Sequence, residues 1–135
     1  MDLSKAFDTI HHELLIAKLH AYGFSMGALD IVHSYLSNRW HRTKVDGSFS
    51  TWKQILSGVP QGSVNGSKLK WFNIYLNDFF FLFLGSSTDV CNIADDSTPY
   101  ACNADLSTLL HNLEGDVASA ILWFDANYMM LNQPK

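Results

Sequence analysis

Asp95 and Asp96 are the residues of this chain whose type and spacing most clearly suggest chemistry. They stand side by side after Ala94, between short β-prone runs that contain no lysine or arginine. Two adjacent carboxylates raise each other's proton affinity unless a cation compensates their charge, and phosphoryl-transfer sites use divalent metals for this purpose. An isolated Asp-Asp pair is usually a solvated turn, so this pair predicts a metal site only if further acidic residues join it.

Two other segments carry residues that suit such a site. The first, 2–8, reads Asp-Leu-Ser-Lys-Ala-Phe-Asp, and the second, 57–63, reads Ser-Gly-Val-Pro-Gln-Gly-Ser. A helical pattern follows the second segment, so its backbone N–H groups would lie at a helix N-terminus and suit a phosphate or sugar. Nucleotidyl transfer needs the attacking oxygen and the leaving pyrophosphate stabilised together, which two metals held by carboxylates achieve.

With these motifs the chain resembles the reverse transcriptase family, and specifically the branch of LINE-type, non-LTR retrotransposons. The segments occur in the family's order: 2–8, 57–63, the Ala-Asp-Asp turn, and finally Trp-Phe at 123–124 through Leu-Asn-Gln-Pro-Lys at 131–135. The resemblance implies RNA-directed DNA synthesis with two Mg²⁺ ions, for which Mn²⁺ is a substitute. It also implies three partners of the full-length parent: an RNA template, a DNA primer and deoxynucleoside triphosphates.

The same resemblance assigns catalytic roles by position. Asp2 and Asp95 match the carboxylates that hold the two magnesium ions, and Asp96 completes the acidic cluster. Lys135 matches a lysine that lies near the triphosphate and is a candidate proton donor to pyrophosphate. Asn132 belongs to the same motif as Lys135, with a less defined role.

Three further residues are expected to bind the nucleotide. Phe7 matches the bulky residue that crowds the sugar and rejects a 2′-hydroxyl. Gln61 matches the residue that lines the nucleotide pocket beside the template base, and Gly62 belongs to the same loop. A sugar-sensing aromatic and a polar loop are what positioning of a nucleotide requires.

Hydrophobic periodicity predicts alternating elements within one domain, 1–135. Helices are expected over 9–22, about 29–36, about 69–77 and 106–128, the last with a stripe of core residues. Asp46-Gly47 predicts a hairpin between 39–45 and 49–55, and two short strands should flank the Asp-Asp turn. These elements predict an α/β (α+β) fold with antiparallel strands packed on helices, and the resemblance implies a polymerase palm-like fragment with fingers and thumb largely missing.

Composition limits the classes of partner. The 135 residues, 47% of them hydrophobic, suffice for one core, and no stretch is long enough to span a membrane. The net charge of −4 disfavours general nucleic-acid affinity, and the resemblance implies that a basic groove lies on other parts of the parent. Four cations of the predicted hairpin read as a solvated face, with phosphate contact as the alternative: Arg39, Arg42, Lys44 and Lys53.

Other residue types suggest an intracellular protein. Cys91 and Cys102 are expected to be free thiols of a reducing compartment, nuclear or cytoplasmic, and no secretory signal precedes the first motif. Most of the four tryptophans are expected in the core or an interface. The pair His11-His12 lacks a metal-binding pattern and is expected to be structural.

Two other functions stay open. The first is a catalytically inactive transposon remnant, acting if at all as an interaction module. It is favoured by the polar segment 65–71, which puts Lys68 and Lys70 where apolar packing is expected, and by the Phe-rich run 79–84, which reads as core or as exposed surface. A frayed terminus around Asp2 would weaken metal binding, and weak or undetectable polymerisation is expected of the isolated chain. The second is a different metal-dependent phosphotransferase, such as a nuclease or cyclase.

Overall fold

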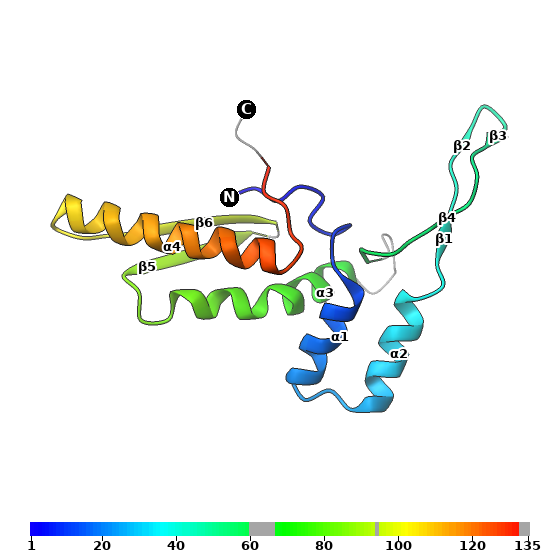
Figure 1. The fold of residues 1–135 in the computed structure, drawn as a ribbon, viewed down its shortest axis with the longest axis horizontal. Coiled ribbons are helices and arrows are strands. Elements are labelled where there is room, and N and C mark those ends of the chain that lie inside the picture. Colours follow the sequence, from blue (N-terminus) through cyan, green and yellow to red (C-terminus); the bar gives the residue numbers. More distant parts are fainter. Residues whose placement is uncertain (60–66, 94, 133–135) are drawn as a thin grey trace.

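Helices and short antiparallel strands alternate along the chain in the computed structural model, which describes residues 1–59, 67–93 and 95–132 (Figure 1). The helices are α1 (His12–Ala21), α2 (Met26–Leu36), α3 (Ser67–Leu76), the 3₁₀ helix η1 (Asn77–Phe83) and α4 (Leu106–Ala126). The strands are β1 (Trp40–His41), β2 (Lys44–Val45), β3 (Ser48–Phe49), β4 (Lys53–Gln54), β5 (Thr88–Ile93) and β6 (Asp96–Ala101). The described residues therefore form a mixed α+β fold with small antiparallel sheets, as the sequence predicted.

The two helices α1 and α2 form a helical hairpin whose ends are set by local signals. The His11 side chain accepts a hydrogen bond from the Leu14 N–H, and the Ser25 hydroxyl accepts one from the Ala28 N–H. Each side chain thereby satisfies a backbone donor at a helix start. Gly23, with φ of +88°, ends the first helix in a conformation that other residues rarely adopt. Both predicted helices are confirmed.

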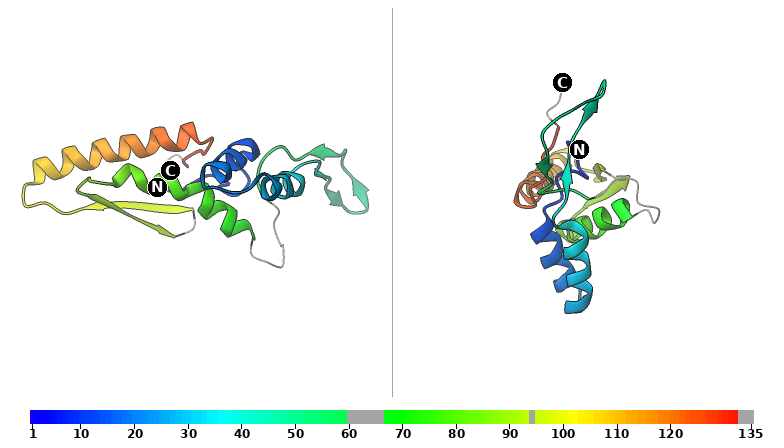
Figure 2. Two further views of the ribbon diagram at one scale, coloured as in Figure 1. Left: turned by 90° about the horizontal axis from the view of Figure 1, so that it is seen from below. Right: turned by 90° about the vertical axis from the view of Figure 1, so that its right-hand side faces the viewer.

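The four shortest strands form one long β-hairpin. Lys44 pairs with Phe49 next to the turn, and Trp40 pairs with Gln54 near the base. Asp46 and Gly47 both have positive φ, at +46° and +84°, which is the geometry of a two-residue turn that matches strand twist. The predicted hairpin is confirmed, and it extends away from the helices (Figures 1 and 2).

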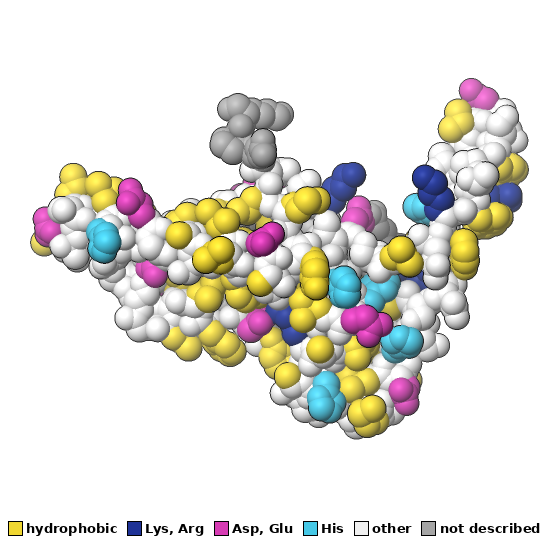
Figure 3. Space-filling view, in the orientation of Figure 1, with side chains coloured by type: hydrophobic (Ala, Val, Ile, Leu, Met, Phe, Trp, Pro, Cys, Tyr) yellow, Lys and Arg dark blue, Asp and Glu magenta, His cyan; other side chains and the backbone are white. Residues whose placement is uncertain are grey.

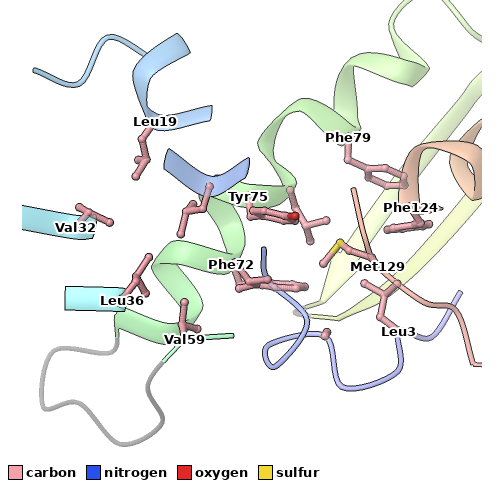
Figure 4. Packing of buried hydrophobic residues seen from close by; sticks show 14 of the residues in the cluster. Leu3, Leu19, Val32, Leu36, Val59, Phe72, Tyr75, Phe79, Phe124 and Met129 are labelled. Atoms are coloured by element: carbon pink, nitrogen blue, oxygen red, sulfur yellow. The ribbon is translucent and has the colours of Figure 1, made fainter. Parts of the chain in front are cut away.

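Helix α3 continues directly into η1, and together they carry much of the core. Phe72, Tyr75 and Phe79 are fully buried on this helical segment, and the Phe79 ring stacks on the Phe124 ring of α4 with centroids 4.8 Å apart (Figure 4). The predicted helix is confirmed, and Lys70 on it is exposed, so this ammonium escapes the burial cost that the sequence suggested. Both interpretations of the Phe-rich run hold, since Phe79 and Phe83 are buried while Phe81 and Leu84 are exposed.

Strands β5 and β6 form the longest sheet, and α4 lies along it (Figure 2). Cys91 pairs with Thr98 and not with Cys102, and both cysteines are free and exposed. The predicted long helix is confirmed, beginning at the N-cap Asp105, whose carboxylate accepts a hydrogen bond from the Thr108 N–H at 2.9 Å. Hydrogen bonds from Thr108 lower the pKa of the Asp105 carboxyl.

Helix α4 corrects one expectation about the core. The sequence predicted that its apolar stripe would pack throughout, but Leu106, Leu110 and Ile121 are exposed and only its last turns reach the core, through Ala120 and Phe124. For Leu106 and Leu110 the reason is geometric, because α4 runs beyond the helices that could cover its first half (Figure 1). Hydrophobic periodicity identifies a helix but not the presence of a neighbour to bury it.

The tryptophans differ in how far they are buried. Trp40 and Trp52 are exposed on the β1–β4 hairpin, whereas Trp71 and Trp123 are partly buried against the core. The hairpin pair is therefore not in the core, because a two-stranded hairpin without a layer packed on it has no interior, and burial of this pair in an interface stays a prediction. Among the described residues, no helix is long and apolar enough to cross a lipid bilayer.

A buried cation joins α1 to the α3–η1 segment. The Lys18 ammonium donates hydrogen bonds to the Asp78 carboxylate at 2.5 Å and to the Tyr75 carbonyl at 3.0 Å. It also lies 4.7 Å from the centre of the Trp123 ring. Burial lowers the pKa of Lys18, and the neighbouring Asp78 carboxylate opposes that shift. The ion pair therefore fixes how the helical hairpin docks on the core.

Candidate active site

The first residues of the chain form a short extended segment beside β6. Met1 and Ser97 exchange backbone hydrogen bonds, at 2.5 Å from the Met1 amine to the Ser97 carbonyl and 2.9 Å in return. Asp2 and Asp96 are the next antiparallel pair. In such a non-hydrogen-bonded pair the side chains project from the same face and lie at their closest. Strand pairing thus brings together two carboxylates 94 residues apart.

The other edge of this segment is paired as well. The Ser4 N–H donates to the Met130 carbonyl at 2.8 Å, the Asn132 N–H donates to the Asp2 carbonyl at 2.9 Å, and Leu3 bridges to Leu131. Leu3 is buried. The expectation of a frayed terminus around Asp2 is therefore wrong, because backbone pairing on both edges and a buried leucine hold this segment in place.

The Asp2 side chain is held by an amide from the far end of the chain. Its Oδ2 accepts a hydrogen bond from Asn132 Nδ2 at 2.7 Å. Asp96 is exposed, with its Oδ1 3.9 Å from the Met1 amine, and Asp95 lies half-buried in the turn between β5 and β6. An amide donor fixes the orientation of a carboxylate without removing its charge.

These carboxylates match the donor chemistry of a hard divalent cation. Mg²⁺ binds one or two protein carboxylates and keeps several waters, which suits an exposed pair such as Asp2 and Asp96. Over the ranges 1–59, 67–93 and 95–132, however, no three acidic, histidine or cysteine side chains are grouped closely enough to enclose an ion. The residue types and the pairing of Asp2 with Asp96 fit the expected ion. Asp95 does not complete a three-residue metal site with them.

Phe7 lies in the turn, residues 4–8, that follows the extended segment. Its ring is half-buried and packs on the Phe72 ring, with centroids 4.7 Å apart. Its carbonyl accepts a hydrogen bond from the Val59 N–H at 3.2 Å. The structure therefore places Phe7 beside Val59, the last described residue before the Pro-Gln-Gly motif.

Gly58 connects the first and second motifs by close backbone contact. It has φ of +79°, and a Cβ added to it would lie 2.7 Å from the Asp8 Cα. The Ser57 hydroxyl donates to the Asp8 carbonyl at 2.9 Å, and His12 Nε2 lies 2.8 Å from the Gly58 carbonyl. Only glycine fits this position, since it tolerates positive φ and has no side chain. The His12 ring thus contacts the backbone of the same segment that approaches Asp8.

Several predicted site residues lie outside the part of the chain that the structure describes. They are Gln61, Gly62 and Lys135. Their assignments stay predictions, and the described ends Val59 and Asn132 lie next to Phe7 and Asp2, respectively. The contact between Asn132 and Asp2 was not foreseen from the sequence, because nothing local in either segment indicates the pairing.

A cavity of about 630 Å³ lies next to Gly58. It is lined by Lys5 and Asp8 of the first motif, by Arg39 and His41 of the hairpin base, and by residues 54–59. One guanidinium nitrogen of Arg39 is buried there without a hydrogen-bond partner among the described residues. The predicted carboxylates do not line this cavity.

Comparison with known proteins agrees with the motifs. The profile of the family described as "Reverse transcriptase (RNA-dependent DNA polymerase)" matches residues 1–135. The "RNA-directed DNA polymerase from mobile element jockey" of Drosophila melanogaster is 31% identical over 110 residues, covering 82% of this chain and 11% of that protein. The "Retrovirus-related Pol polyprotein from type-1 retrotransposable element R2" of Popillia japonica is 28% identical over 144 aligned positions, covering 100% of this chain and 23% of that protein.

The chain therefore belongs to the reverse transcriptase family. The resemblance to reverse transcriptases of LINE-type, non-LTR elements is confirmed by these relatives. The chain spans less than a quarter of the length of either relative.

Proposed function

We propose that this chain contributes part of the palm of a reverse transcriptase and takes part in RNA-directed DNA synthesis. The observation that carries the proposal is the antiparallel pair of Asp2 and Asp96, next to Asp95 in the same turn. Two carboxylates from two distant motifs, Asp2 and Asp96, are thus paired across strands, and Asp95 precedes Asp96 in the chain. Chance pairing of a loop with β6 would not favour acidic residues at this position, because like charges opposite each other destabilise a sheet.

In this proposal Asp2 and Asp95 hold two Mg²⁺ ions and Asp96 completes the cluster. When bound, such ions stabilise the attacking and leaving oxygens of the transferred nucleotidyl group. The chain itself supplies orientation: Asn132 fixes the Asp2 carboxylate, and packing on Phe72 fixes Phe7 as the residue that crowds the sugar. Gln61 and Gly62 would line the nucleotide pocket, and Lys135 would donate a proton to pyrophosphate.

The partners follow from the same proposal. They are an RNA template, a DNA primer and deoxynucleoside triphosphates, bound by the longer protein of which the relatives are examples. The proposed location is the nucleus or cytoplasm, and exposed, free thiols such as those of Cys91 and Cys102 suit a reducing compartment.

Manganese binding to the purified chain tests the proposal directly, because Mn²⁺ substitutes for Mg²⁺ and its electron paramagnetic resonance signal falls on binding. We expect Asp2→Asn and Asp95→Asn each to weaken Mn²⁺ binding at least about tenfold, since each removes a charged ligand. Asp89→Asn is the matched control, because Asp89 is exposed on β5 and pairs with Tyr100, away from the turn.

Equal affinity in all four proteins, or no binding by the parent chain, would overturn the proposed site. The inactive transposon remnant would then be the better account. Circular dichroism of each variant distinguishes a lost ligand from a lost fold, because replacing a carboxylate outside the core by an amide of the same shape should leave the helical signal unchanged.

A further inference from the structure

We call the long β-hairpin, residues 39–55, the arm. It extends away from the helices and the β5–β6 sheet (Figures 1 and 2). None of its side chains is buried: Arg39 and Ile55 at its base are half-buried and the rest are exposed. An element without an apolar layer on either face contributes little to the core, so packing of the core does not explain which residues the arm contains.

Charge separates the arm from the rest of the molecule. Four cations and one acid, Asp46, give it a net charge of +3, whereas the whole chain carries −4, so the remaining residues carry −7. Figure 3 shows Lys and Arg side chains on the arm. A polyanion approaching this molecule would be attracted to the arm and repelled by most of the remaining surface.

Aromatic rings share a face of the arm with these cations. Trp40, Phe49 and Trp52 are 55%, 52% and 57% exposed, respectively. The Arg42 guanidinium lies 3.8 Å from the centre of the Phe49 ring and 4.6 Å from that of Trp52, and the Lys44 ammonium lies 5.3 Å from Phe49. Lys44 and Phe49 are directly opposite, so their side chains are on one face. Arg42, Lys44, Phe49 and Trp52 form what we call the cation–aromatic stripe.

We propose that the cation–aromatic stripe binds single-stranded nucleic acid. Proteins that bind single strands without sequence preference combine cations along the phosphate backbone with exposed aromatic rings on which bases stack. The stripe has both components, with its two cations on the first half of the hairpin and its two rings on the second, in contact across the hairpin. A duplex is a poorer fit, because its base faces are already stacked and cannot pack on Phe49 or Trp52. The identification of the strand as RNA rests on the proposed function. The arguments from charge and aromatic rings apply to any single-stranded nucleic acid and are independent of that function.

The test measures binding of a fluorescein-labelled oligouridylate of 12 nucleotides to the whole chain by fluorescence anisotropy in EDTA. We expect binding at low salt that is at least about tenfold tighter than binding to a duplex of equal length. Lys44→Gln should reduce the slope of log affinity against log salt by about 0.7, the value for one phosphate contact on a single strand. The matched control, Lys70→Gln, removes an exposed lysine from α3 and should leave that slope unchanged.

A second pair of variants tests stacking. Trp52→Ala should weaken binding about tenfold, Trp52→Phe should restore most of it, and Phe81→Ala, which removes an equally exposed ring from η1, should have no effect. An oligodeoxythymidylate of the same length distinguishes RNA from DNA. Since both arm residues are exposed, an unchanged circular dichroism spectrum should accompany every loss of affinity.

Three results would overturn the inference. They are no measurable binding at low salt, equal affinity for single strand and duplex, and equal effects of the arm variants and their controls. The last would point instead to a protein surface as the arm's partner. Because EDTA removes divalent ions, failure here leaves the manganese result unaffected, and loss of manganese binding leaves this assay unaffected.

Discussion

Asn132 donates its side-chain amide to the Asp2 carboxylate at 2.7 Å, joining residues 130 positions apart. The backbone bond from the Asn132 N–H to the Asp2 carbonyl, at 2.9 Å, fixes both residues relative to each other. The same Asp2 pairs on its other side with Asp96. The proposed metal ligand is therefore positioned from both edges of its strand by segments that are distant in sequence.

Asn132→Ala should weaken manganese binding about tenfold, because an outer hydrogen bond that orients a ligand typically contributes at least this factor. Electron paramagnetic resonance of Mn²⁺ would measure it. Asn73→Ala, an exposed asparagine on α3, is the control and should have no effect. If the two variants bind manganese equally well, Asn132 only pairs strands and does not orient Asp2.

Gly58→Ala should destabilise the fold by about 3 kcal/mol, since it adds backbone strain at positive φ to a collision with the Asp8 backbone. Gly85→Ala has nearly the same φ, +82°, but open space around it, so it should cost only about 1 kcal/mol. Urea unfolding of both variants separates strain from collision. Equal losses would contradict the close contact between the two motifs.

Tyr75→Phe should change how stability depends on alkaline pH. Burial raises the pKa of Tyr75 from 10.0 to about 12, and its hydroxyl donates to the Asn127 carbonyl at 2.8 Å. Because the folded pKa is the higher one, the stabilisation is fully present below pH 10 and is lost as pH rises toward 12. At pH 9 the variant should be about 1 kcal/mol less stable.

Urea unfolding at pH 9 and pH 11 checks this. The stability difference between Tyr75→Phe and the parent chain should shrink at the higher pH. Tyr100→Phe, at an exposed position on β6, should show no such change. A difference that stays constant between the two pH values would contradict the buried, hydrogen-bonded hydroxyl.

Lys18→Met should destabilise the fold by about 2 kcal/mol, because it leaves the Asp78 carboxylate without its ammonium partner. Combining it with Asp78→Asn should cost less than the two single variants together, since the second change removes the unpaired charge. A double-mutant cycle by urea unfolding measures this coupling. Additive losses would show that the 2.5 Å contact contributes no coupling energy.

Local patterns made much of the secondary structure predictable. The apolar spacing of α1, Gly23 after it, and the Asp46-Gly47 turn each act through nearby backbone geometry, so the sequence alone sufficed. The segments with candidate site residues were recognisable for the same reason, since their order and spacing are properties of the chain. Those patterns also identified the family before any fold was known.

Only the tertiary structure decided which of these elements meet. The pairing of Asp2 with Asp96, its hydrogen bond from Asn132, and the Gly58–Asp8 approach all join residues far apart in sequence. The exposure of Leu106 and Trp52 likewise depends on whether another element packs over them, and not on either residue's own hydrophobicity. Hydrophobic periodicity indicates which face of an element is apolar. Burial of that face and pairing of carboxylates both require a second element opposite the first. The packing of the whole chain determines where that second element lies.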